Sequence, residues 1–239
     1  MIDLGLLAWS PPGWGGSLLI GLLRTIEVAL AAYMLGAVIG LGGAFGKLHG
    51  WRWLRRGLVA YTTLFRAIPE LVLILVLYYA GPDLLNRLLL LLGYRPIDIS
   101  GFAAGVLALG VVQGAYATEV LRGAMLAVPA GQIEAGAAFG MSIWQQQRRI
   151  VIPAMIPFAL PGLANLWLMV IKDTALLAVV GYNELAKTAQ QAAGGTRAFF
   201  MFYAAAALIY LALTLCSNQI IGRVERRFRQ GQASLRSEG

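Results

Sequence analysis

Residues 122–153, RGAMLAVPAGQIEAGAAFGMSIWQQQRRIVIP, separate two long apolar stretches of the chain. Its middle is compatible with a helix and rich in small side chains: Glu134, Ala135, Gly136, Ala137, Ala138 and Gly140. Pro129 and Gly131 can mark the start of that helix, and Gly140 a turn out of it. A short, smooth helix of this kind suits insertion into a groove on another protein. An ordinary connecting loop with one helical turn fits the same residues equally well.

The flanking sequence predicts a membrane protein. Hydrophobic residues make up 59% of the 239 residues and charged residues 13%, against about 45–50% and about 25% in soluble domains. Crossing a bilayer takes about 20 apolar residues in a helix. Five stretches meet that requirement: residues 17–45, 57–80, 101–121, 153–180 and 198–221. We therefore predict an all-α membrane protein with five transmembrane helices. Residues 84–93 are apolar but short, and Arg87 interrupts them, which favours an interfacial helix or a re-entrant cap.

The basic residues predict the orientation of these helices. The formal net charge is +8, and its positive side chains concentrate in alternate connections. The first loop, the third loop and the segment after the last stretch carry Lys47, Arg52, Arg55, Arg56, Arg148, Arg149, Arg223, Arg226, Arg227 and Arg229. The alternate segments contain fewer Lys and Arg. This bias places the N-terminus in the periplasm and the C-terminus in the cytoplasm.

Ionisable residues inside or beside the apolar stretches are the candidates for a solute pathway. They are Arg66, Glu70, Glu119, Lys172 and Asp173. A charge near the bilayer centre costs roughly 2.5–3.5 kcal/mol on insertion scales, so it should face a water-filled cavity or a partner. Arg66 and Glu70 are four residues apart and share a helical face. They can contact solute or form an internal pair, and Glu119 can likewise pair with Arg122 at the cytoplasmic rim.

The residues needed for catalysis are missing from the sequence. No G-x-x-x-x-G-K-[ST] segment is present, so the chain itself does not hold ATP in a P-loop. The single histidine, His49, and the single cysteine, Cys216, supply neither a catalytic set nor a metal site. We predict a transport subunit that is not an enzyme. An ATPase-independent secondary transporter or channel, and a membrane scaffold, are the alternatives.

The segment EAGAAFG, followed by RRIVIPAMIP, resembles the EAA loop of ABC importer permeases. That pattern reads E-A-A, three residues and G, and Gly136 departs from its second Ala by one small residue for another. Ile150 and Pro153 fit the end of the pattern. The resemblance implies that this loop contacts the cytoplasmic ATPase through Glu134, Ala135, Gly136, Gly140 and Met141.

Three further segments narrow the resemblance. They are YTTLFRAIPELVL (61–73), QGAYATEVLRGAMLAVPAGQIEA (113–135) and IKDTALLAVVGYNEL (171–185). Over nearly the full chain they are similar to the polar amino acid permeases, and in particular to the histidine, lysine, arginine and ornithine group with the related opine permeases. This likeness implies a type I importer permease fold. It also implies one transmembrane permease domain over residues 1–239, with a cytoplasmic coupling loop at about 123–152.

The resemblance also implies an assembly and a place in the cell. A second permease, identical or homologous, two ATPase subunits that hold ATP and Mg²⁺, and a periplasmic amino-acid-binding protein would complete a bacterial inner-membrane importer. It would move its solute from periplasm to cytoplasm by alternating access. The acidic residues in the spans favour histidine, arginine, lysine, ornithine or an opine. A neutral polar amino acid remains open.

Overall fold

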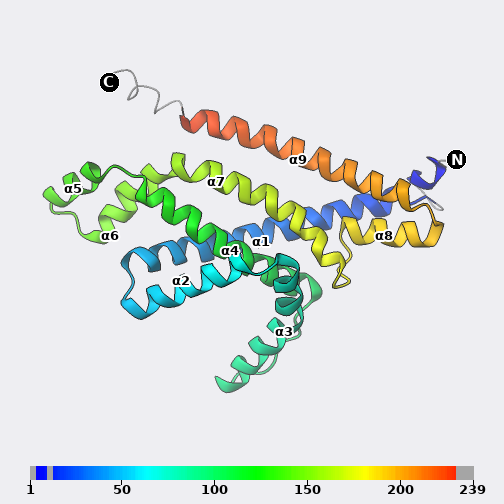
Figure 1. Cartoon of the computed structure of the whole chain (residues 1–239), viewed down its shortest axis with the longest axis horizontal. Coiled ribbons are helices and arrows are strands. Elements are labelled where there is room, and N and C mark those ends of the chain that lie inside the picture. Colours follow the sequence, from blue (N-terminus) through cyan, green and yellow to red (C-terminus); the bar gives the residue numbers. More distant parts are fainter. Residues whose placement is uncertain (1–3, 10–12, 230–239) are drawn as a thin grey trace.

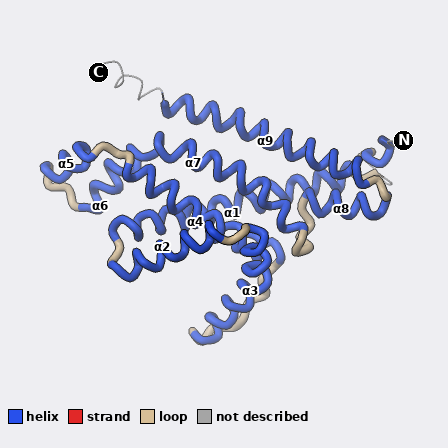
Figure 2. Tube along the Cα trace, viewed as in Figure 1, coloured by secondary structure: helices blue, strands red, loops and turns tan. Residues whose placement is uncertain are grey.

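The computed structural model describes residues 4–9 and 13–229, and all regular structure within these ranges is helical (Figure 2). The long helices are α1 (Gly15–His49), α3 (Glu70–Leu91), α4 (Gly101–Leu126), α7 (Ile152–Asp173) and α9 (Phe199–Arg229). Shorter elements are η1 (Leu4–Leu7), α2 (Arg52–Ala67), α5 (Ala130–Ala138), α6 (Ile143–Gln146), the π-helical turn η2 (Gln147–Val151), η3 (Thr174–Ala178) and α8 (Leu185–Thr196). Five helices or helix runs are long and apolar enough to cross a membrane. The five-helix prediction is therefore confirmed.

The second predicted span has different bounds in the structure. A single helix over residues 57–80 was wrong, because α2 ends at Ala67 and α3 begins at Glu70. A residue that precedes proline avoids the α conformation, and Ile68, before Pro69, is extended with φ −90° and ψ 140°. The apolar residues 84–91 continue α3 and do not form a separate interfacial helix. In Figure 1, α3 extends away from the other helices.

The core is built around close packing of α1 against α4. Gly36 and Gly40 of α1 face α4, where an added Cβ would lie 2.9 Å from the Gln113 Cβ and 2.5 Å from the Ala117 Cβ. Small residues at such positions let two backbones approach closely, which is the usual basis of helix association in membranes. By contrast, Gly42 faces open space. Gly36 and Gly40 therefore serve the packing of α1 against α4, whereas Gly42 does not.

The two ends of the molecule differ in their helices. Figure 1 shows α5 and α6 together at one end, and α8 with the described N-terminal residues at the other. Because α1, α7 and α9 run along this direction, and α4 runs from the α5 end to the middle beside α3, a site at either end is linked to the middle by continuous helices.

Candidate functional site

Charged residues from three parts of the chain meet where two helices end and one begins. Arg66 lies in the last turn of α2, Glu70 is the first residue of α3, and Asp173 is the last residue of α7. The break at Pro69 places Glu70 at a helix N-terminus, where the helix dipole favours a negative charge. Asp173 is the last α-helical residue of α7, and the chain continues directly into η3 (Thr174–Ala178). We call Arg66, Glu70, Gln113, Tyr116 and Asp173 the central cluster.

The contacts of the central cluster bring its two carboxyl groups together. Gln113 on α4 donates its Nε2–H to the Asp173 Oδ2 at 3.1 Å. Glu70 interacts electrostatically with both Asp173 and the phenol of Tyr116. The Arg66 guanidinium lies 5.8 Å from the centroid of the Tyr116 ring, a cation–π distance. The cluster therefore combines two carboxyl groups with one guanidinium group.

Neither carboxyl group of the central cluster has an ion-pair partner among the described residues. Both ion pairs found among those residues involve Glu119 instead. Gln113 is 2% exposed, and its Oε1 has no hydrogen-bond partner among the described residues. Two uncompensated acidic groups beside one arginine can bind a solute that carries both a carboxylate and cationic groups. Lys172 is exposed, whereas its neighbour Asp173 is partly buried. The structure thus brings together three of the five residues predicted for the pathway: Arg66, Glu70 and Asp173.

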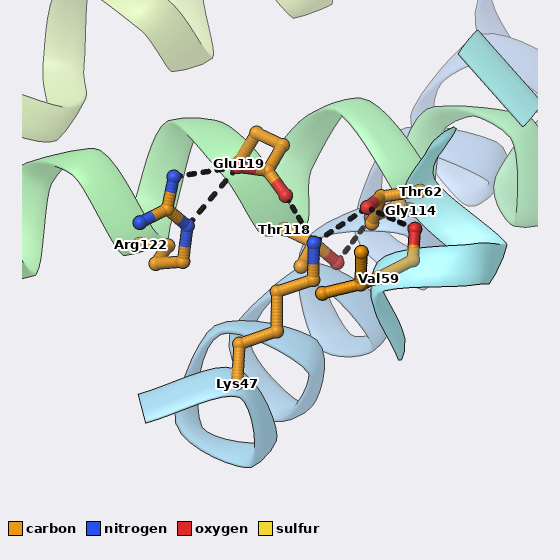
Figure 3. Close-up of polar contacts among 7 residues, drawn as sticks. All are labelled: Lys47, Val59, Thr62, Gly114, Thr118, Glu119 and Arg122. Carbon is orange, nitrogen blue, oxygen red and sulfur yellow. Dashed lines mark hydrogen bonds and ion pairs between the residues drawn. The ribbon is translucent and has the colours of Figure 1, made fainter. Parts of the chain in front are cut away.

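Glu119 lies in a different cluster (Figure 3), with Lys47, Thr62 and Arg122. The Lys47 Nζ donates to the Glu119 Oε1 and, at 2.5 Å, to the Thr62 Oγ1. Arg122 donates from Nε and Nη2 to the Glu119 Oε2 at 3.0 and 2.9 Å. The Glu119–Arg122 pair was one of the two alternatives considered from the sequence. Lys47 was missed as its partner, because 72 residues separate them and Lys47 resembles an ordinary loop charge.

The predicted coupling segment forms helix α5 and the turn after it. Glu134 and Ala135 are exposed, whereas Gly136 is buried and its added Cβ would lie 2.6 Å from the Ile150 Cδ1. Gly140 has a φ of +73° with open space around it, so its backbone conformation is what favours glycine. The Met141 N–H donates to the Gly136 carbonyl at 3.1 Å and closes the turn. Apolar side chains of this region are also exposed, including Phe139 at 85%.

Glu184 is a buried carboxyl group that was not among the residues predicted from the sequence. It accepts hydrogen bonds from the Tyr210 hydroxyl at 2.7 Å, the Thr25 Oγ1 at 3.2 Å and the Lys187 N–H at 2.8 Å. These contacts join α1, α8 and α9. Burial raises the pKa of Glu184 above its ordinary value, while the hydrogen bonds act in the opposite direction. Because Glu184 lies between two apolar stretches, its sequence context resembles that of a solvated loop residue.

The chain matches the family described as the binding-protein-dependent transport system inner membrane component over residues 18–230. It belongs to this family and is a transmembrane permease component of an ABC importer. It is 42% identical to the nopaline transport system permease protein NocQ of Agrobacterium fabrum, over 98% of this chain and 100% of that one. It is 41% identical to the histidine/lysine/arginine/ornithine transport system permease protein HisQ of Escherichia coli, over 92% and 96% respectively.

Solved structures support the same assignment. An amino acid ABC transporter crystallised with histidines superposes with a TM-score of 0.75 at 29% identity, covering 90% of this chain and 95% of the other. The MetNI methionine ABC transporter superposes with a TM-score of 0.72 at 20% identity, over 91% and 98%, and shows a shared fold. The predicted permease fold and membership of the amino acid and opine permease group are therefore confirmed.

Proposed function

We propose that this chain carries a polar amino acid with a cationic side chain, or an opine, across the bacterial inner membrane. The relatives named for nopaline and for histidine, lysine, arginine and ornithine support this solute class. The observation that carries the proposal is the approach of Glu70 and Asp173, from two helices, with no cation paired to either among the described residues. A cationic solute would provide the missing positive charge. Arg66 would bind its carboxylate.

The second part of the proposal is the supply of energy by a separate ATPase. Helix α5, with the exposed Glu134 and Ala135 and the apolar side chains of Phe139 and Trp144 beside it, would dock into a groove of that subunit. A pair of ATPases holding ATP and Mg²⁺, a second permease and a periplasmic binding protein would complete the importer. Closure of the ATPases would move α5 and the spans, and would switch the side to which the central cluster opens.

Uptake by the purified complex in vesicles tests the solute assignment. Labelled arginine, lysine, histidine and an opine are offered one by one, with ATP and with the binding protein. ATP-dependent accumulation of at least one of them is expected. Accumulation by the permease alone, without ATPase or nucleotide, would instead establish the secondary transporter considered as the alternative.

A glycine substitution tests the coupling assignment. Gly140→Trp places bulk at the exposed turn after α5 and strains a residue whose φ is +73°. Assembly with the ATPase and ATP-driven uptake should both be lost. Gly131→Ala is the matched control, because Gly131 lies in α5 with open space around it and without a positive φ. Normal assembly and uptake in the Gly140→Trp variant would contradict docking through this segment.

A further inference from the structure

A basic cavity of about 340 Å³ lies beside the central cluster, between α1, α2 and α4. Its volume falls in the range of small-molecule sites. One face of α2 forms much of the wall, through Arg55, Val59, Thr62, Thr63 and Arg66. These positions are spaced by four, three, one and three residues, so they lie along one stripe of the helix. The stripe leads from the central cluster toward the N-terminal end of α2. The basic residues of the first loop predict that this end lies on the cytoplasmic side.

The charges around the cavity are unbalanced. Four cationic side chains line it, from Lys47, Arg55, Arg66 and Arg122, against the single carboxylate of Glu119. Lys47 and Arg122 are paired with that carboxylate. Within the described part of the chain, Arg55 and Arg66 form no ion pair and the Thr63 hydroxyl makes no hydrogen bond. Two guanidinium groups and a hydroxyl therefore remain available to an anionic group.

Arg66 connects this cavity to the central cluster. It lines the cavity, and its guanidinium also lies 5.8 Å from the centroid of the Tyr116 ring of the cluster. A carboxylate bound to Arg66 in the central cluster could thus pass to Arg55 while remaining close to a positively charged side chain. A lipid headgroup would also meet these cations, but it would make no use of the link to the central cluster.

We propose that this cavity is a second solute site, which holds the carboxylate of the transported amino acid after the cationic groups of that solute leave Glu70 and Asp173. This inference rests on the proposed function for its solute. Arg55 and Arg66 bind the carboxylate, and Thr63 donates a hydrogen bond to it. The site retains the solute on the release side while the central cluster is free to change its access.

Thiol modification of the assembled importer tests the site directly. Thr63→Cys is made in a Cys216→Ser background, because the natural Cys216 is exposed. The purified complex, in detergent with neutral lipid, is treated with an anionic or a cationic methanethiosulfonate reagent. The anionic reagent should react about tenfold faster, because clustered charge concentrates counter-ions. Arg55→Gln should remove most of this preference.

Matched controls separate the cavity from the general charge of α2. Ala60→Cys lies on α2 but does not line the cavity, and Arg52→Gln removes an exposed arginine that does not line it either. Neither should show the effect. Equal rates for both reagents at the thiol introduced by Thr63→Cys, or an Arg52→Gln effect as large as that of Arg55→Gln, would overturn the anion site.

Protection of the same introduced thiol identifies the ligand. Millimolar L-arginine should slow its modification, whereas agmatine, which lacks the carboxylate, should not. Equal protection by agmatine would overturn binding through the carboxylate, and protection by added phosphatidylglycerol in place of arginine would assign the site to a lipid headgroup. Because thiol reactivity needs no transport, failure of this site stays distinguishable from absent ATP-driven uptake, which would contradict the proposed function.

Discussion

The central cluster and the Glu119 cluster both combine carboxyl groups with basic side chains, but the carboxyl group is ion-paired only in the Glu119 cluster. In the Glu119 cluster one carboxylate is held by Lys47 and Arg122, and Lys47 also donates to Thr62. In the central cluster Glu70 and Asp173 lie near each other, and Gln113 supplies the hydrogen bond to Asp173. Internal pairing makes the first cluster a brace between α1, α2 and α4. The lack of pairing leaves the second able to bind a cation.

The largest expected effect is a loss of stability when the ion pair between Lys47 and Glu119 is removed. Glu119→Gln would leave the Lys47 ammonium, whose side chain is 7% exposed, without its carboxylate. Breaking a buried pair costs about 3–5 kcal/mol, and we expect about 3 kcal/mol here because Glu119 is partly exposed. Unfolding of the detergent-solubilised protein measures it. Lys47→Met combined with Glu119→Leu should recover much of the loss, since no buried charge remains unpaired. An unchanged stability in Glu119→Gln would refute the brace.

The second effect is on transport, when the acidic groups of the central cluster are neutralised. Glu70→Gln and Asp173→Asn should each lower the uptake of a cationic amino acid about tenfold or more, since a hydrogen bond to a charged group is worth about 1.5–3 kcal/mol. Unfolding should change little, because neither residue has an ion pair to lose among those described. Lys172→Gln is the matched control, with an exposed charge beside Asp173. Unchanged uptake kinetics in Glu70→Gln would exclude Glu70 from contact with solute.

A smaller effect separates the two partners of Glu119. The Arg122 side chain is 36% exposed, and solvent screens its ion pair, so Arg122→Gln should cost about 0.5 kcal/mol of stability. Lys47 keeps the carboxylate compensated in that variant. The same unfolding measurement checks the value. A loss as large as that of Glu119→Gln would show that Arg122, and not Lys47, holds the brace together.

The smallest effect concerns Glu184, a third carboxyl group, which is buried and hydrogen-bonded but not ion-paired within the described residues. Its pKa in the folded protein is raised above the ordinary 4.5, so the folded state binds more protons than the unfolded state in the window above that value. Stability should therefore fall as the pH rises from about 4.5 through the raised pKa, and then level off. Glu184→Gln should remove this decline. Melting temperatures of both proteins between about pH 4.5 and 8 provide the check, and parallel curves would contradict it.

The break between α2 and α3 illustrates what the sequence could and could not predict about the second span. Pro69 cannot continue the hydrogen bonds of a helix, and the chain breaks there between α2 and α3. The sequence did not show that residues 70–91 would then form the span while residues 52–67 packed against α1 and α4. Hydropathy measures apolar content in a window, and windows that begin at residue 57 or at residue 70 overlap. Packing against neighbouring helices decides between them.

Local chemistry in the sequence was sufficient to determine the number of apolar crossings, the glycine turn after α5 and the class of protein. These features depend on residues near one another along the chain, and on the solvation of apolar side chains by lipid. The tertiary structure alone decided which charges pair: Lys47 with Glu119, 72 positions apart, and Gln113 with Asp173, 60 apart. Such pairs depend on how the helices pack and rotate against each other, because the direction of a side chain around a helix becomes a contact only when a neighbouring helix is in place.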